Sequence, residues 1–160
     1  MIGPAGNGKS TLAELIANRM NWRFVEGDEH HPPANIAKMA RGEPLSDEDR
    51  MPFLESVART LSASSGGAVA ACSALKREYR DVLRRHAGDL VLILAEVGRE
   101  ELHRRMSQRD THFMPASLLD SQLAEFEIPD DDESCIRIDG TLPLNQQADL
   151  VIQRLTVGQE

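Results

Sequence analysis

The hydrophobic positions of this chain alternate between short β-branched runs and longer stretches in which apolar residues recur every three or four positions. This alternation is typical of a mostly parallel sheet covered by helices on both faces, and we predict a three-layer α/β protein. The predicted helices span residues 9–20, 49–63, 76–85, 99–109, 117–127 and 144–155, and the predicted strands span 22–26, 68–72, 90–96 and 135–139.

The segments between these elements are polar and short, without repeats or a linker that would separate two domains. We therefore expect one domain over residues 1–160. Ser46 and Asp49 have the spacing of a capping box and predict the start of a helix. The acidic run at 130–133 is interpreted as a solvated turn.

Composition limits the binding partners and the cellular location that we expect for the protein. A formal net charge of -8 disfavours nucleic acid and anionic membrane as partners, and an anionic substrate would need a locally basic pocket. No apolar run is long enough to span a bilayer and the N-terminus lacks the regions of a signal peptide, so we expect a cytoplasmic protein. Cys72 and Cys135 are interpreted as free thiols.

The strongest chemical signal is Gly-Pro-Ala-Gly-Asn-Gly-Lys-Ser at residues 3–10, which matches GxxxxGKS directly ahead of a predicted helix. Glycines let the backbone N–H groups curl around phosphate oxygens, Lys9 reaches the β- and γ-phosphates, and the Ser10 hydroxyl is a ligand suited to Mg²⁺. The alternative is a glycine-rich turn before an ordinary helix. The expected nucleotide-binding residues of the loop are Gly3, Pro4, Ala5, Gly6, Asn7, Gly8, Lys9, Ser10 and Thr11.

Further motifs select among phosphate-loop proteins. A guanine-reading Asn-Lys-x-Asp segment, which a GTPase would need, is absent from the sequence, and only residues 91–96 come close to the acidic strand end of a motor ATPase. Asp28 follows the second apolar run, which is where small-molecule kinases place an acidic residue beside the γ-phosphate. His30 and His31 are adjacent and have no cysteine nearby, which argues against a zinc site.

Long blocks of the chain resemble the gluconokinase family. Residues 27–54 match GDxxHPxxNxxKMxxGxPLxDxDRxPWL, with Phe53 where the family usually has Trp, and residues 72–84 match CSALKxxYRDxLR. Arg109 with residues 112–114 resembles the family's lid. The resemblance implies Mg·ATP-dependent phosphorylation of D-gluconate to 6-phosphogluconate, a substrate segment at about 28–64, a lid at about 105–122, and a homodimer.

Particular residues carry this expected chemistry. Lys9, Asp28 and Arg109 are the candidate catalytic residues, with Asp28 orienting or deprotonating the acceptor hydroxyl. Arg105 and Arg109 lie one turn apart and are expected to close over the phosphates, although a solvated helix end would also favour arginine. The candidate substrate-binding residues are Asp28, His31, Lys38, Arg50, Lys76 and Arg80.

Simpler interpretations of these residues stay open. Asp28 could be an ordinary turn residue, and the stripe of Lys76, Arg80 and Arg84 has the spacing of a solvated helix face. Gly140 lies where the family has its adenine-side loop, but a plain turn explains it equally well.

The phosphate loop normally follows a hydrophobic strand, yet only Met1 and Ile2 precede Gly3. In the family's expected strand order 2-3-1-4-5 this first strand would lie between residues 68–72 and 90–96, and we expect it to be missing from this chain. The missing strand leaves a nucleotide-binding remnant without turnover as one alternative to gluconokinase activity. The other alternative is the same chemistry on another small acid such as shikimate.

Overall fold

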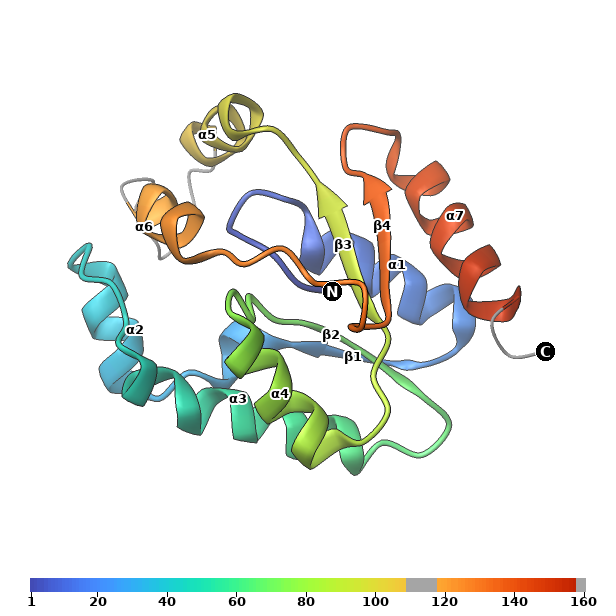
Figure 1. Cartoon of the computed structure of the whole chain (residues 1–160), viewed down its shortest axis with the longest axis horizontal. Coiled ribbons are helices and arrows are strands. Elements are labelled where there is room, and N and C mark those ends of the chain that lie inside the picture. The colour runs from blue at the N-terminus through green and yellow to red at the C-terminus, as the bar shows by residue number, and fades with distance from the viewer. Residues whose placement is uncertain (109–117, 158–160) are drawn as a thin grey trace.

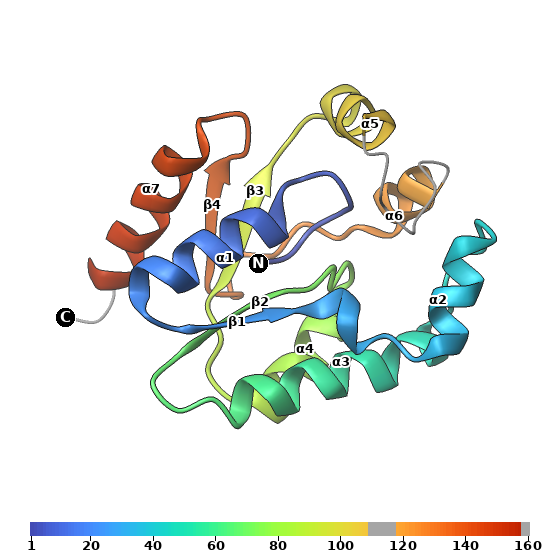
Figure 2. The ribbon, with the colours of Figure 1, turned by 180° about the vertical axis from the view of Figure 1, so that it is seen from behind.

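The computed structural model describes residues 1–108 and 118–157, which build three layers. Helices α1 (Lys9–Met20) and α7 (Leu144–Val157) pack on one face of a parallel sheet, whereas α3 (Asp47–Ser62) and α4 (Arg77–Ala87) pack on the other (Figures 1 and 2). Each pair of helices closes over its own apolar cluster. The predicted three-layer α/β architecture is confirmed.

The strands form two parallel pairs. β1 (Arg23–Glu26) pairs with β2 (Ala68–Ala71), and β3 (Leu92–Glu96) pairs with β4 (Cys135–Asp139). The apolar residues of β3 alternate between the two clusters, with Leu92 and Leu94 toward α3 and α4 and with Ile93 and Ala95 toward α1 and α7. A strand buried on both faces is expected in a parallel sheet, which explains its uninterrupted apolar run.

Residues 1–3 hold the two pairs together at the middle of the sheet. The Met1 amino group donates to Ala70 O (2.7 Å), Cys72 N–H donates to Met1 O (3.0 Å), and Ile2 N–H donates to Ile93 O (2.9 Å). Ile2 also forms an isolated parallel bridge with Leu94. The position expected for the first strand, between β2 and β3, is thus occupied by Met1 and Ile2, and the expectation that this strand is missing is corrected to that extent.

An apolar cavity of about 310 Å³ continues from Met1 between β2 and β3. Its walls include Ala68 and Ala70 of β2, Ile93 of β3 with Val91 just before it, and side chains of α3 and α4. Burial lowers the pKa of the Met1 amino group at the head of this cavity to about 6. The middle of the sheet is therefore less filled than its outer pairs.

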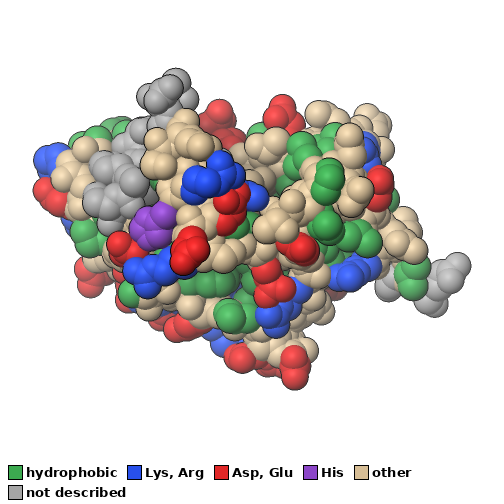
Figure 3. Space-filling view, turned by 90° about the horizontal axis from the view of Figure 1, so that it is seen from above, with side chains coloured by type: hydrophobic (Ala, Val, Ile, Leu, Met, Phe, Trp, Pro, Cys, Tyr) green, Lys and Arg blue, Asp and Glu red, His purple; other side chains and the backbone are tan. Residues whose placement is uncertain are grey.

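Shorter elements gather around the carboxyl ends of the strands. They are η1 (Gly27–His30), α2 (Pro33–Ala40), α5 (Arg99–Ser107) and α6 (Leu118–Glu125). A third apolar cluster joins Ala5 of the phosphate loop to Met39, Leu102 and Leu119, so these elements are anchored to the loop. The molecule seen from the side of α5 and α6 carries acidic and basic side chains intermingled (Figure 3).

Several local predictions are tested directly. The Ser46 capping box is present with both of its hydrogen bonds, and α1 and β4 have the predicted bounds. The α2 helix was not predicted. The prediction of a solvated turn at 130–133 is wrong for Glu133, whose side chain has no exposed surface.

Both cysteines are free; Cys72 is buried and Cys135 is half-buried. None of the described helices is long and apolar enough to cross a membrane.

Candidate active site

The phosphate loop links Ile2 at the middle of the sheet to the first turn of α1. Gly3, Gly6 and Gly8 all have positive φ, at 123°, 85° and 86°, a region that residues with a Cβ rarely enter. A Cβ on Gly3 would also lie 2.4 Å from Asn7 Nδ2. The curl of the loop therefore depends on glycine at these positions, which is the geometry that turns successive N–H groups inward.

Two side-chain amides hold the loop in shape. Asn7 is buried; its Nδ2 donates to Ile2 O (3.0 Å) and its Oδ1 accepts from Lys9 N–H (3.2 Å). Gln122, from α6, accepts from Ala5 N–H through Oε1 (2.8 Å). Lys9 Nζ also donates to Pro4 O (3.2 Å). The loop is thus fixed from inside by its own asparagine and from outside by α6.

A cavity opens in front of this loop. It is bounded on one side by the loop and on the other by residues that follow β1 and β2, with α3 and α6 closing the ends. Ligand sites of α/β proteins lie at this carboxyl edge of the sheet. The polar residues that line it are Lys9, Ser10, Asp28, His31, Arg50, Ser73, Ser121 and Gln122.

Asp28 reaches the cavity because the turn after β1 lies tight against β2. A Cβ on Gly27 would be 2.2 Å from Ala71 O, so only glycine fits there. Glu26 Oε1 accepts from Asp28 N–H (3.3 Å) and caps the short helix η1. Asp28 therefore lines the same cavity as Lys9 and Ser10 of the phosphate loop.

His31 is held firmly at the far wall. Its ring stacks on Phe53 of α3, with centroids 3.9 Å apart and planes at 12°, and its Nδ1 is 3.3 Å from Asn35 Nδ2. Burial, as the main cause, lowers the pKa of His31 to about 4, against the opposing influence of Asp28. The imidazole is therefore neutral at physiological pH.

Arg50 is the buried cation of the cavity. Its Nη2 is 3.1 Å from Glu125 Oε2, and its guanidinium carbon lies 5.4 Å from the centroid of the Tyr79 ring. Its Nε is buried without a hydrogen-bond partner in the described part of the chain. A buried charged donor without a partner is costly to the folded state.

Three other predicted substrate residues do not line this cavity. Lys38 Nζ is 2.6 Å from Asp49 Oδ2, and this contact lowers the pKa of Asp49 to about 2. Lys76 Nζ is 2.7 Å from Asp47 Oδ1 on the outer surface. Arg80 belongs to α4, and its side chain is buried. The structure brings Asp28, His31 and Arg50 together at the cavity. The side chains of Lys38, Lys76 and Arg80 lie elsewhere.

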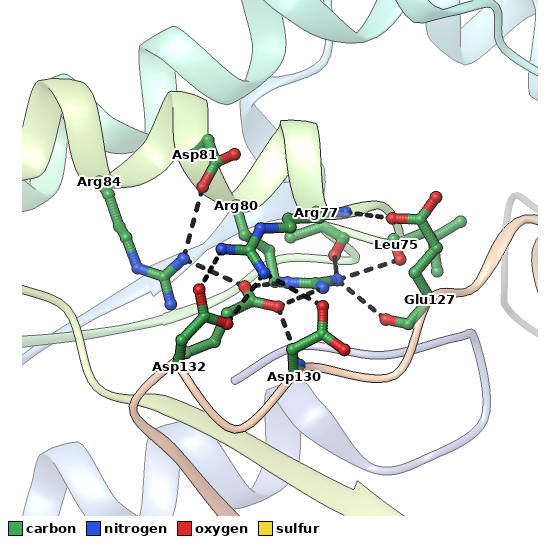
Figure 4. A network of polar contacts seen from close by, with 10 residues as sticks. Leu75, Arg77, Arg80, Asp81, Arg84, Glu127, Asp130 and Asp132 are labelled. Carbon is green, nitrogen blue, oxygen red and sulfur yellow. Dashed lines mark hydrogen bonds and ion pairs between the residues drawn. The ribbon is translucent and has the colours of Figure 1, made fainter.

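Arg80 belongs to a buried network that joins α4 to the segment before β4 (Figure 4). Its Nε and Nη2 each lie 2.7 Å from a carboxylate oxygen of Glu133, and its Nη1 donates to Leu75 O (3.2 Å) and Glu127 O (3.0 Å). Arg84 adds a second ion pair to Glu133 at 3.0 Å. The hydrogen bonds to Arg80, the largest cause, lower the pKa of Glu133 to about 2.

Of the two predicted lid arginines, only Arg105 lies within the described residues. Its Nη1 donates to Gly6 O (3.4 Å), its Nη2 donates to Gly140 O (3.0 Å), and its Nε pairs with Glu101 (2.8 Å). Arg105 thus connects the phosphate loop to the loop after β4. Arg109 lies outside the described residues.

Several residues of the site were not predicted from the sequence. Gln122 and Ser121 on α6, Ser73 after β2, and Glu125 beside Arg50 all belong to the site. Ser73 falls in the block at 72–84 that resembles the family, and its position in that block was the available signal. These residues are far from the phosphate loop along the chain, so no local sequence pattern linked them to it.

Solved structures with the same chain trace define the class. A sugar kinase from Janibacter sp. HTCC2649 superimposes with a TM-score of 0.90 at 42% identity, covering 97% of this chain and 91% of that one. A gluconokinase from Sinorhizobium meliloti 1021 superimposes with a TM-score of 0.84 at 37% identity, covering 99% and 95%. The fold and its phosphate loop are those of the P-loop kinases that act on small molecules.

Sequence comparison gives the family within this class. The family model described as shikimate kinase matches residues 5–131. The gluconokinase of Gluconobacter oxydans is 44% identical over 158 residues, which cover 97% of this chain and 86% of the relative. The chain belongs to the gluconokinase family.

Proposed function

We propose that this protein transfers the terminal phosphoryl group of ATP to D-gluconate, giving 6-phosphogluconate and ADP. The observation that carries the proposal is that one cavity is lined by both the phosphate loop and the segment after β1. Phosphates held by the loop and an acceptor beside Asp28 would therefore meet within that cavity. The gluconokinases among its relatives supply the choice of acceptor.

The reaction needs positioning and charge stabilisation more than covalent chemistry. The terminal hydroxyl oxygen of gluconate attacks the γ-phosphorus, the bond from that phosphorus to the β,γ-bridging oxygen breaks, and the hydroxyl proton is lost. Asp28 orients the hydroxyl and accepts its proton, and Lys9 stabilises the charge on the transferred group. Arg105, and Arg109 from the expected lid, would add donors around the phosphates.

The residues of the cavity fit Mg²⁺, although within the described chain no three His, Cys, Asp or Glu side chains cluster to hold a metal alone. Mg²⁺ prefers hard oxygen ligands and keeps several waters, so it needs few groups from the protein. Ser10 would supply a hydroxyl ligand and Asp28 would hold a coordinated water. When bound, the ion would neutralise charge on the β- and γ-phosphates.

Arg50 is the residue best suited to the carboxylate of gluconate. It is a buried cation in an otherwise acidic protein, and its Nε has no partner in the described residues. His31 and Ser121 are neutral groups in the same cavity and suit the hydroxyls of a polyol. Lys38 belongs to the proposed substrate segment, and Lys76 and Arg80 lie outside it; the present contacts of all three are with carboxylates of the protein.

The proposal is tested by coupled ADP release with gluconate and a panel of sugar acids and polyols. Turnover with gluconate, at a kcat/KM well above that for the other compounds, supports it. Absence of ADP release with gluconate under conditions where ATP is bound would refute it and would favour a nucleotide-binding remnant.

A second candidate acceptor is shikimate, because the family model that matches residues 5–131 carries that description. Shikimate is also a small hydroxylated carboxylic acid, so Arg50 and Asp28 could serve it in the same way. The same panel separates the two acceptors, since each predicts a preference for a different acid.

We further propose that the enzyme acts in the cytoplasm, and as a homodimer by resemblance to its family. Light scattering coupled to size exclusion measures the second point directly. A mass of one chain at working concentration would contradict it.

A further inference from the structure

The wall of the cavity formed by His31 contains an amide whose orientation can be deduced. Asn35 of α2 is buried, and its Nδ2 lies 2.7 Å from the main-chain oxygen of Asp49. A carbonyl oxygen only accepts hydrogen bonds, so the group facing it is the amide nitrogen. The contact with Asp49 therefore fixes which way round the Asn35 amide lies.

The same amide nitrogen lies 3.3 Å from His31 Nδ1. It carries two hydrogens, one directed to Asp49 O and one left for the imidazole, and it cannot accept. Nδ1 must then be the unprotonated nitrogen of the ring, because two donors would oppose each other. In a neutral imidazole the hydrogen is consequently on Nε2.

Nε2 is the edge of the ring left for the cavity. His31 lines the cavity together with Asp28, and among the described residues Nε2 has no hydrogen-bond partner. The stack on Phe53 holds the ring plane, and Asn35 occupies the opposite nitrogen. Burial keeps the ring neutral, reinforced by the nearby charge of Arg50 and by His30, and Asp28 acts against them.

We propose that Asn35 is a positioning residue that fixes His31 as a neutral Nε2–H donor, and that this donor binds a hydroxyl oxygen of the polyol substrate beside Asp28. Only the second part of the proposal, the binding of a substrate hydroxyl, rests on the proposed function. A neutral donor leaves the charge of Asp28 free to accept the hydroxyl proton. An imidazolium at the same place would pair with that carboxylate and compete for it.

The first half is tested on the ligand-free protein by ¹⁵N NMR of the histidine side chains, with His31 assigned by its loss in His31→Gln. The expected spectrum shows the Nε2–H form, unchanged as the pH falls until it approaches the pKa of about 4. An Nδ1–H form, or an imidazolium near neutral pH, would overturn the proposal. This measurement needs no turnover, so failure of gluconate as a substrate would leave its result standing.

A pair of His31 variants tests the second half. The amide nitrogen of glutamine can reach the place of Nε2, whereas that of asparagine reaches only as far as Nδ1. With ATP held saturating, His31→Gln should retain a KM for gluconate about five- to tenfold lower than His31→Asn, the size expected for one hydrogen bond. Equal KM values in two folded variants would overturn the assignment of the donor.

Asn35→Asp reverses the polarity of the contact. A carboxylate at this position accepts from Nδ1–H, so the His31 spectrum should change to the Nδ1–H or doubly protonated form and its pKa should rise. The KM for gluconate should increase and its pH dependence should move toward neutrality. A folded Asn35→Asp protein with an unchanged His31 spectrum would overturn the role of Asn35. If this variant does not fold, the wild-type spectrum and the His31 pair still decide the question.

Discussion

Arg50 and Arg80 are both almost completely buried, yet the protein satisfies their guanidinium groups to different degrees. Arg80 spans both oxygens of Glu133 and also donates to main-chain carbonyls. Arg50 has one ion pair with Glu125 and leaves its Nε without a partner in the described residues. The first arrangement is complete without a ligand, whereas the second leaves one buried donor of Arg50 without a partner among the described residues.

This difference separates two kinds of buried charge. Removing one partner from a completed buried pair leaves an uncompensated charge and damages stability. Changing a donor that is only partly used should damage ligand binding more than folding. The region around Glu133 is thus expected to control stability, and the region around the phosphate loop and Arg50 is expected to control activity.

The largest effect should come from the phosphate loop. Lys9→Ala removes the cation that stabilises the transferred phosphoryl group, so kcat should fall by roughly a thousandfold or more while the melting temperature changes little. Steady-state kinetics and calorimetry measure the two quantities. Arg59→Ala, on the exposed side of α3, is a control for loss of a surface cation. Unchanged turnover in Lys9→Ala would show that residues 3–10 are not the phosphate site.

The next largest effect concerns stability alone. Glu133→Gln breaks the buried pair with Arg80 and should lower the free energy of unfolding by about 3–5 kcal/mol. Urea unfolding measures it. Asp132→Asn is the matched control, because Asp132 is exposed and pairs with Arg77 on the surface. A loss in Glu133→Gln no greater than in Asp132→Asn would contradict the structural role of this network.

Low pH should reduce the stability of the folded protein through the carboxylate of Glu133. The pKa of Glu133 is lowered from 4.5 to about 2, so its ionised form stabilises the folded state above the unfolded pKa, and this contribution is lost as the pH falls toward 2. By linkage, the wild-type protein should lose up to about 3 kcal/mol over that range from this group. Glu133→Gln lacks the group, so its stability should depend less on pH. Parallel pH dependence of the two proteins would exclude Glu133 as the source.

The smallest and most selective effect should distinguish the two arginines. Arg50→Lys keeps the charge but loses Nε, and should raise the KM for gluconate by about tenfold with little change in melting temperature. Arg80→Lys should do the opposite, lowering the melting temperature while the KM stays close to the wild-type value. A raised KM in Arg80→Lys without loss of stability would return Arg80 to the substrate pocket.

Local sequence patterns predicted the elements whose causes are local. The capping box at Ser46, the helix at 9–20 and the strand at 135–139 depend on residues a few positions apart, and all three are confirmed. The α2 helix has only eight residues, and it depends on Met39 packing against the phosphate loop, a contact that no local pattern reveals.

The site was harder to predict because charge spacing does not identify ion-pair partners. Lys76 and Arg80 share a helical stripe, but their partners are Asp47 and Glu133, 29 and 53 positions away. Whether such a cation is free to bind substrate or is paired within the protein depends on these distant carboxylates. Asp28 and His31 were easier, because the resemblance gave them together with the loop.

The cavity beneath Met1 has a consequence for hydrogen exchange. In most α/β domains the central strands contain the slowest-exchanging amides, because unfolding of the whole domain is needed to expose them. Here Ala70 and Ile93 direct main-chain groups toward a strand position that only Met1 and Ile2 occupy. In a chain that begins at Met1, deuterium should therefore enter Ala70 and Val91 before it enters Val69 and Leu92, whose amides face the paired strands. The order of exchange across this sheet would then run from its centre outward.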